Sequence, residues 1–534
     1  MDDTYLWWKD GVIYQIYPRS FMDSNEDGIG DLPGISSKLD YLVNLGIDAI
    51  WLSPFFPSPD VDFGYDITDY LGVDAKFGTF SDLEFLITEA HSRGIRIILD
   101  LVLNHTSDQH PWFIQSRRSH DNPYRNWYIW RSTDKGQLPN NWISVFGGTG
   151  WELSQDTGDY YYHMFYKEQP DLNWRNPQVR QAMFDVMRFW LEKGVDGFRL
   201  DVFNVYFKHS LFPDNPPKFG LRDFDRQSHL YDFDQPEMIL LLKEMRTLLD
   251  AYPERYAVGE PLLATTKQAA RYCDSGLLHA VFEFSLSRSP WSARRFLSTA
   301  QNWSMALSPE SWPNYVLNNH DITRSASRYG WGEDDERLKV AAAFLLTQRG
   351  TPFLYYGEEI GMRNIPLKRS QIQDLIGKRY WPIFPGRDGC RAPFQWDDTP
   401  NAGFSKVRPW LPVHPDYTWR NVAAQSEDPD SLLTFYRRLL RLRREHTALR
   451  QGIFLSLTFD PRFVLGYLRQ DASETILVAL NFSRIPLRLV LGGKLAIRTW
   501  QVLLSNRREE GEKFSGSFLP LGKNEVCILK MGKL

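Results

Sequence analysis

The sequence has few cysteines and no long apolar run, and each absence excludes a class of protein. Its 534 residues include only three cysteines, Cys273, Cys390 and Cys527. This odd and sparse set supplies neither a disulfide framework nor the spacing of a zinc site. No stretch approaches the roughly 20 apolar residues that a membrane-spanning helix requires. We therefore expect a soluble protein without a membrane partner.

Excess charge of either sign is also missing. The chain has 62 basic and 66 acidic residues, a formal net charge of -4, so nothing in the charge balance favours a nucleic-acid partner. The opening residues Met1-Asp2-Asp3-Thr4 show neither the basic start nor the apolar run of a signal peptide. A cytoplasmic location is expected, although a mature secreted form that had lost its signal would look the same.

Aromatic residues, by contrast, are abundant. They make up 15% of the chain and include 19 tryptophans. Aromatic faces stack on the apolar faces of sugar rings, which suits a carbohydrate site, but a large aromatic core would have the same composition. The length is too great for one ordinary core and indicates a large barrel with additional domains.

The order of elements predicts an α/β fold. Three times in the first 200 residues a helical stretch ends at a glycine, Gly46, Gly94 or Gly194, and a buried-type apolar strand follows. Glycine suits the left-handed position after a helix, and apolar strands of this kind belong to parallel sheets. Eight strands are expected, at residues 12–17, 49–52, 97–102, 198–201, 256–259, 280–284, 315–317 and 353–356. Eight strands with helices between them predict a (β/α)8 TIM barrel.

Two segments depart from this alternation of helices and strands and predict further domains. Residues 104–171, after the third strand, are rich in Trp, Tyr, Asn and Gly and predict an inserted subdomain on the catalytic face. Residues 451–534 contain short alternating runs and predict a C-terminal antiparallel β-sandwich. The barrel itself is then formed by residues 1–103 and 172–450, with a basic amphipathic helix near its end at 431–446.

Three expected strands end on a carboxylate. Asp201 closes Gly197-Phe198-Arg199-Leu200-Asp201, Glu260 follows the strand at 256–259, and Asp321 ends Asn319-His320-Asp321. A parallel barrel collects such strand ends on one face, where barrel enzymes perform their chemistry. One such acid alone would be a helix cap or a solvated turn residue. Three together favour glycoside hydrolysis, which uses two acids facing one bond.

The segments 100–105, 197–201, 259–260 and 319–321, in this order, closely resemble the conserved regions of the α-amylase superfamily, glycoside hydrolase family 13. The segments 169–174, 350–359 and 386–396 look like its α-glucosidase and oligo-1,6-glucosidase branch. The resemblance implies a retaining, exo-acting α-glucosidase. Such an enzyme removes terminal glucose from short substrates such as maltose or isomaltose, can transfer it to acceptor hydroxyls, and needs no organic cofactor.

The family's catalytic roles come to this chain only through the resemblance. It implies that Asp201 is the nucleophile, that Glu260 is the acid/base and that Asp321 stabilises the transition state. Arg199 would keep Asp201 ionised by its positive charge. The implied substrate-binding residues are Asp62, Tyr65, His105, Phe146, Phe165, Arg199, Phe284, His320 and Arg387. Of these, Asp62 and Arg387 would bind the 4-hydroxyl of the terminal glucose.

Alternatives within and outside this activity stay open. A trehalose synthase or a sucrose-isomerising enzyme would share the three acids, although the Arg-Leu-Asp-Arg segment of the isomerases is missing near Arg369. An inactive relative serving as a transporter's accessory domain should lack the acids or carry a membrane span. The sequence leaves linkage preference, chain-length limit, oligomeric state and the balance of transfer over hydrolysis undetermined.

An early loop predicts a structural metal. Oxygen-bearing residues alternate around a glycine turn, as in a calcium loop, and the expected ligands of Ca²⁺ or Mg²⁺ are Asp23, Asn25, Asp27, Ile29 and Asp31. Gly34 stands where such a loop would place its bidentate glutamate. The alternative is a polar turn closed by its own side-chain hydrogen bonds.

Overall fold

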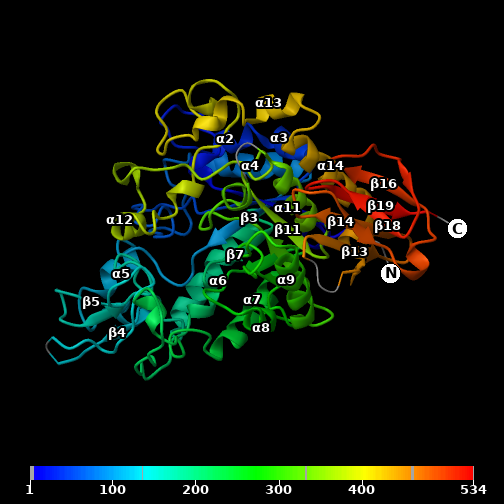
Figure 1. Cartoon of the computed structure of the whole chain (residues 1–534). Coiled ribbons are helices and arrows are strands. Elements are labelled where there is room, and N and C mark those ends of the chain that lie inside the picture. Colours follow the sequence, from blue (N-terminus) through cyan, green and yellow to red (C-terminus); the bar gives the residue numbers. More distant parts are fainter. Residues whose placement is uncertain (1–4, 135, 331–333, 459–461, 533–534) are drawn as a thin grey trace.

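The computed structural model describes residues 5–134, 136–330, 334–458 and 462–532, and Figure 1 shows the whole chain. Its largest sheet has eight strands in the order β10-β11-β1-β2-β3-β7-β8-β9, and every paired neighbour runs parallel. The strands are β1 (Ile13–Ile16), β2 (Ala49–Leu52), β3 (Arg96–Leu101), β7 (Gly197–Leu200), β8 (Tyr256–Gly259), β9 (Ala280–Val281), β10 (Asn314–Val316) and β11 (Thr351–Tyr355). The predicted (β/α)8 barrel and its eight strands are confirmed.

Helices link these strands and lie outside the sheet (Figure 1). They include α3 (Leu39–Leu45), α4 (Phe80–Ser92), α6 (Pro177–Glu192), α7 (Glu237–Asp250), α9 (Ala293–Ala306) and α11 (Glu336–Thr347). Helix α4 begins at a capping box formed by Thr79 and Asp82, which satisfies the free N–H groups of its first turn. Gly46 follows α3 at φ 95°, a left-handed position that glycine adopts without steric cost. Helix ends and strand starts are therefore encoded locally.

The inside of the barrel is packed with apolar side chains. Ile13, Ile98, Val258 and Phe353, each from a different strand, are at most 1% exposed and belong to one buried cluster. Because successive residues of a strand point to opposite faces, the alternate residues face the helices. The packed interior forms a rigid support for the loops at the carboxyl ends of the strands.

The part of the chain between β3 and α6 contains a small antiparallel sheet. Its strands β4 (Trp130–Arg131), β6 (Tyr160–Tyr162) and β5 (Trp151–Leu153) pair in that order, beside helix α5 (Pro111–Ser116). The two ends of the predicted insertion meet, since His105 and Asp171 form an isolated antiparallel bridge. This geometry agrees with an inserted subdomain, while its limits at 104 and 171 stay predictions.

The C-terminal residues form antiparallel sheets, coloured orange to red in Figure 1. One sheet has the order β12-β13-β14-β19-β16-β17 and a second pairs β15 with β18. The strands are β12 (Ile453–Ser456), β13 (Val464–Gln470), β14 (Thr475–Asn481), β15 (Leu487–Val490), β16 (Trp500–Ser505), β17 (Lys513–Phe514), β18 (Phe518–Leu521) and β19 (Val526–Met531). Helix α14 (Leu432–Glu445) precedes them, and its buried Arg443 donates to backbone oxygens of Leu346 and Leu449. The predicted basic helix therefore packs on the barrel, and Arg469 of β13 links the C-terminal unit to it by donating to the backbone oxygens of Thr347 and Leu449.

Within the described residues, every helix is too short or too polar to cross a bilayer.

Candidate active site

A cavity of about 210 Å³ opens at the carboxyl ends of the barrel strands. Asp201 and Glu260 each directly follow a strand, β7 and β8, and Asp321 lies in the loop after β10. The cavity is lined by Asp62, Tyr65, His105, Val145, Phe146, Phe165, Asp201, Val202, Arg222, Glu260, Leu262, His320, Asp321, Ile376, Phe384 and Arg387. Residues far apart in the sequence thus meet because parallel strands end on the same face.

The Arg199 guanidinium joins the two acids. One terminal nitrogen lies 2.6 Å from an oxygen of Asp201, and the other donates to Glu260. Arg199 is on β7, two residues before Asp201, so both side chains point to the same side of the strand. Because a single planar group contacts both carboxylates, their relative position is determined by the strand and not by flexible loops.

Asp100, at the end of β3, holds Arg199 in turn. One of its oxygens lies 2.6 Å from Arg199, and the other accepts hydrogen bonds from Trp51 Nε1 at 3.2 Å and Tyr65 Oη at 3.0 Å. Asp100 lines no part of the cavity, so it acts by positioning Arg199. No role followed from the sequence for Asp100, although it begins the segment 100–105 that resembles a conserved region of the family.

The cluster holds three carboxylates around one guanidinium. Burial raises the pKa of Glu260, and Arg199 opposes this rise. Burial, together with Asp100 and Glu260, also raises the pKa of Asp201 and outweighs the lowering by Arg199. Arg199 therefore acts in the expected direction, but burial and the neighbouring carboxylates outweigh its effect on the pKa of Asp201. The three carboxylates therefore repel one another, and the one guanidinium between them opposes that repulsion.

Asp321 has the opposite electrostatic environment. Burial favours its neutral form, but His320 and the guanidinium groups of Arg387 and Arg391 hold the pKa of Asp321 below its usual range. Arg391 lies 2.7 Å from the Asp321 carboxylate, and Arg387 lies 3.6 Å away. The Asp321 side chain is 36% exposed. An ionised carboxylate is therefore held open to the cavity.

One side of the cavity is closed by an ion-pair network. Arg387 lies 2.6 Å from Asp62 and is held from behind by Asp374, which binds its Nε and one terminal nitrogen at 3.0 Å. The turn that carries Asp62 is ordered by buried Asp66, which accepts from the backbone N–H of Val61 and Asp62. Asp374 was not assigned from the sequence, because it lies 13 residues from Arg387 without a recognisable spacing.

Tyr65, His320 and His105 also reach the cavity. The rings of Tyr65 and His320 stack at 5.3 Å, and the hydroxyl of Tyr65 lies 2.7 Å from His320 Nε2. Burial lowers the pKa of His320 to about 3 and that of His105 to about 4. Both imidazoles are therefore neutral near pH 7 and suited to hydrogen bonding with hydroxyl groups.

Two predicted substrate-binding residues do not line this cavity, Arg199, which lies behind the two acids, and Phe284. Phe284 stacks on Phe282, a member of the barrel's buried cluster, at 5.6 Å, and lines a separate cavity of about 420 Å³ with Glu283. Strand β9 ends at Val281, earlier than expected, so Phe284 belongs to the following loop. Phe146 and Phe165 do line the catalytic cavity.

The predicted metal loop is closed by its own hydrogen bonds. Asp23 accepts from the backbone N–H groups of Asn25, Glu26 and Gly28. Asp31 caps helix α2 (Leu32–Ser36) through Gly34 N–H at 2.6 Å. Among the residues that the structure describes, no group of three or more His, Cys, Asp or Glu side chains is placed to hold a metal. Metal binding therefore stays a prediction.

Comparisons with known proteins agree with this geometry. The family model for the α-amylase catalytic domain matches residues 15–452. The chain belongs to the α-amylase family, glycoside hydrolase family 13. Within this family it is 42% identical to an oligo-1,6-glucosidase of Parageobacillus thermoglucosidasius, over 94% of this chain and 95% of that protein. It is also 42% identical to a probable α-glucosidase of Rhizobium meliloti, over 89% of each.

Solved structures of family 13 enzymes have the same fold. A crystal structure of an α-glucosyl transfer enzyme matches with a TM-score of 0.93 and 38% identity, covering 99% of this chain and 100% of that one. The trehalulose synthase of Pseudomonas mesoacidophila matches at 0.91 and 36%, again covering 99% and 100%. The resemblance to family 13 drawn from the motifs is confirmed.

Proposed function

We propose that this protein is a retaining, exo-acting α-glucosidase in which Asp201 is the nucleophile, Glu260 the acid/base and Asp321 the transition-state stabiliser. The observation that carries the proposal is the shared contact of Asp201 and Glu260 with Arg199, at the wall of a cavity that is closed at one end. Contact with one guanidinium agrees with the short separation of about 5–5.5 Å between the acids of retaining enzymes.

The roles implied by the family assign the two chemical steps. Glu260, whose pKa is raised by burial, protonates the leaving oxygen while Asp201 attacks the anomeric carbon and forms a glucosyl ester. Glu260, now ionised, then removes a proton from water, and the water oxygen displaces Asp201. The ionised Asp321 faces the positive charge that develops on the sugar ring in both steps.

The closed end of the cavity explains exo action. Asp62 and Arg387 pair at 2.6 Å, and Asp374 prevents Arg387 from turning away. Paired groups of this kind can accept from and donate to one sugar hydroxyl. A chain that continued beyond the terminal glucose would collide with this network, so only a non-reducing end fits.

A product profile on maltose, isomaltose, sucrose and trehalose tests the proposal. Glucose released initially as the α-anomer from maltose or isomaltose is the expected result. Structural similarity to trehalulose synthase and isomaltulose synthase makes a sucrose-active enzyme the alternative, and conversion of sucrose into an isomer would favour it. Initial release of β-glucose, or no turnover of any of the four, would contradict the proposal.

The most specific part of the proposal is a preference for α-1,6 over α-1,4 linkages. Val202 directly follows Asp201, lines the cavity and has a left-handed backbone with φ 37°. In the branch that this chain resembles, valine there accompanies α-1,6 activity. A branched apolar side chain crowds a sugar that is joined through its secondary 4-oxygen more than a sugar that is joined through its flexible 6-oxygen. One such contact changes the discrimination between the two substrates by ~1–3 kcal/mol. We expect Val202→Ala, which removes the branch, to lower the isomaltose-to-maltose ratio of kcat/KM several-fold, and an unchanged ratio would exclude Val202 as the determinant.

We also propose that Asp23, Asn25, Asp27 and the Ile29 carbonyl hold a structural Ca²⁺ or Mg²⁺, with Asp31 beside them. The support is the alternation of oxygen-bearing residues in the sequence. Asp23 is 4% exposed and already accepts hydrogen bonds from three backbone N–H groups and from the Ser405 hydroxyl, so a bound ion would displace some of them. Chelation should then lower the melting temperature, because a bound ion stabilises only the folded state, with little change in low-temperature rate. An unchanged melting temperature in chelator and in added calcium would support the hydrogen-bonded turn instead.

We further propose that the protein is located in the cytoplasm. The cysteines Cys273, Cys390 and Cys527 are all unpaired and buried, as is usual where thiols stay reduced. Fractionation of the native host should place the activity with cytoplasmic markers, and recovery outside the cell membrane would refute it.

A further inference from the structure

Two segments from outside the barrel meet over the closed end of the catalytic cavity. One is the α12 loop, which spans residues 373–388 and contains helix α12 (Leu375–Tyr380). Its two ends are joined, since Asp374 accepts hydrogen bonds from the backbone N–H of Arg387 at 2.8 Å and from the Arg387 side chain. A Cβ added at Gly377 would lie 2.5 Å from a backbone oxygen of the opposite arm. The α12 loop is therefore one closely packed unit that carries Arg387.

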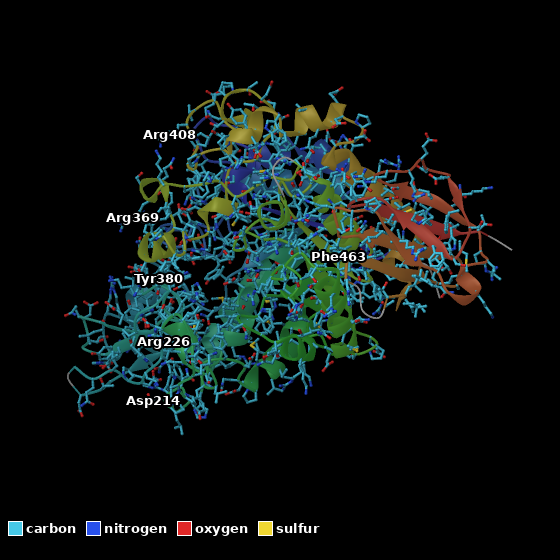
Figure 2. The ribbon with its side chains drawn as sticks, in the orientation of Figure 1. Asp214, Arg226, Arg369, Tyr380, Arg408 and Phe463 are labelled. Atoms are coloured by element: carbon cyan, nitrogen blue, oxygen red, sulfur yellow. The ribbon has the colours of Figure 1, made fainter. Side chains whose placement is uncertain are left out.

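The second segment is a turn of the inserted subdomain at residues 144–148. Gly147 in this turn has φ 91°, and a Cβ there would collide with the hydroxyl oxygen of Tyr380 and lie 3.2 Å from Arg379 Cζ. Arg379 also donates to the backbone oxygens of Phe146 and Gly147, at 3.2 and 3.0 Å. Figure 2 shows Tyr380 where the α12 loop meets the inserted subdomain. The approach is this close because residue 147 has no side chain.

The same contact positions two residues of the cavity wall. Phe146 of the turn and Arg387 of the α12 loop both line the cavity, and the Arg387 guanidinium lies 5.3 Å from the centre of the Phe146 ring. Ile376 of α12 also lines the cavity and packs in the same buried cluster as Phe146. A wider spacing between the turn and the α12 loop would therefore open a gap between Phe146 and Arg387, beside the Asp62 carboxylate that Arg387 pairs with.

We propose that the contact between Gly147 and Tyr380 excludes glucosides that are substituted on the 4-hydroxyl of the terminal glucose; this rests on the proposed function. Neither residue lines the cavity, so both act by positioning Phe146 and Arg387. A substituent on the 4-oxygen has to leave the cavity beside Arg387, because Asp62 and Arg387 are the groups that would bind the 4-hydroxyl. While the turn and the α12 loop are in contact, that path is closed.

Two p-nitrophenyl α-glucosides, one unmodified and one with a methyl group on the 4-oxygen, test the proposal. They share a leaving group, so the ratio of their kcat/KM values reports on the closed end of the cavity and is independent of the fraction of enzyme that is folded. Wild type should favour the unmodified glucoside by about 100-fold, within the range for one additional methyl group in a fitted pocket. Gly147→Ala should lower this ratio to about tenfold or less, because its methyl group separates the turn from the α12 loop.

Gly148→Ala is the matched control. Gly148 has φ 87°, close to that of Gly147, but a Cβ there would lie no nearer than 3.9 Å, from Arg379. The same backbone strain without a collision should leave the ratio unchanged. Combining Gly147→Ala with Tyr380→Phe should restore the ratio, because the alanine methyl group then takes the place of the removed hydroxyl oxygen.

Equal use of both glucosides by wild type, an unchanged ratio in Gly147→Ala, an equal fall in Gly148→Ala or no recovery in the double variant would each overturn the inference. If Gly147→Ala does not fold, Tyr380→Ala opens the same gap from the other side and should lower the ratio, and an unchanged ratio there would overturn the inference as well. In each of these cases, p-nitrophenol released from the unmodified glucoside would still support an α-glucosidase. No release by wild type would instead contradict the proposed function, and the inference with it.

Discussion

Replacing Asp201 with asparagine is expected to lower kcat by roughly 10⁴-fold or more, the scale seen when a covalent nucleophile is removed. Asparagine is nearly isosteric and can keep a contact with Arg199, which lies 2.6 Å from Asp201, but its amide does not attack the anomeric carbon. The melting temperature should stay equal or rise, because one of three mutually repelling carboxylates is gone. Initial rates on maltose and isomaltose, with thermal unfolding, measure both effects.

The matched control is Asp185→Asn, on the exposed face of α6, which should keep both rate and melting temperature. Catalysis within tenfold of wild type in Asp201→Asn would remove Asp201 from the role of nucleophile. A large fall in melting temperature would show that the carboxylate acts mainly in the fold.

The second large effect is expected at Glu260 and depends on the leaving group. Glu260→Gln cannot protonate the glycosidic oxygen, so maltose hydrolysis should fall by about 10²–10⁴-fold, the usual contribution of general acid catalysis. Formation of the glucosyl ester from α-glucosyl fluoride should be nearly spared, because fluoride needs no proton. We expect a rapid burst of fluoride followed by slow turnover, since the variant also lacks the base that activates water for hydrolysis of the glucosyl ester.

The role of Glu260 also predicts how activity changes with pH. Burial raises the pKa of Glu260, and only the protonated carboxyl can act as the acid. Activity on maltose should therefore be lost as pH rises through this raised pKa, which is the alkaline limb of the profile. The fluoride burst needs no acid, so it should lack that limb in wild type and in Glu260→Gln alike, and an alkaline limb in the burst of Glu260→Gln would point to another titrating group.

Much of the fold followed from local sequence. The stop at Gly46 and the apolar runs at 49–52 and 256–259 reappear as helix end and strands, because left-handed caps and buried strands depend on short-range sterics and composition. Strand β9 is the exception. Only Ala280–Val281 pairs within the expected run at 280–284, and a continuous apolar run cannot indicate where pairing stops.

The sequence by itself determined the barrel, its two additional units, and the three acids at the ends of β7, β8 and β10, since each is encoded by local pattern or by motif. Tertiary structure alone decided that Asp100 holds Arg199, that Asp374 and Arg391 restrain Arg387 and Asp321, and that Phe284 leaves the cavity. Those contacts join residues of separate loops. They depend on which strand ends lie side by side and on how far each loop folds over the barrel. The spacing of residues along the sequence determines neither.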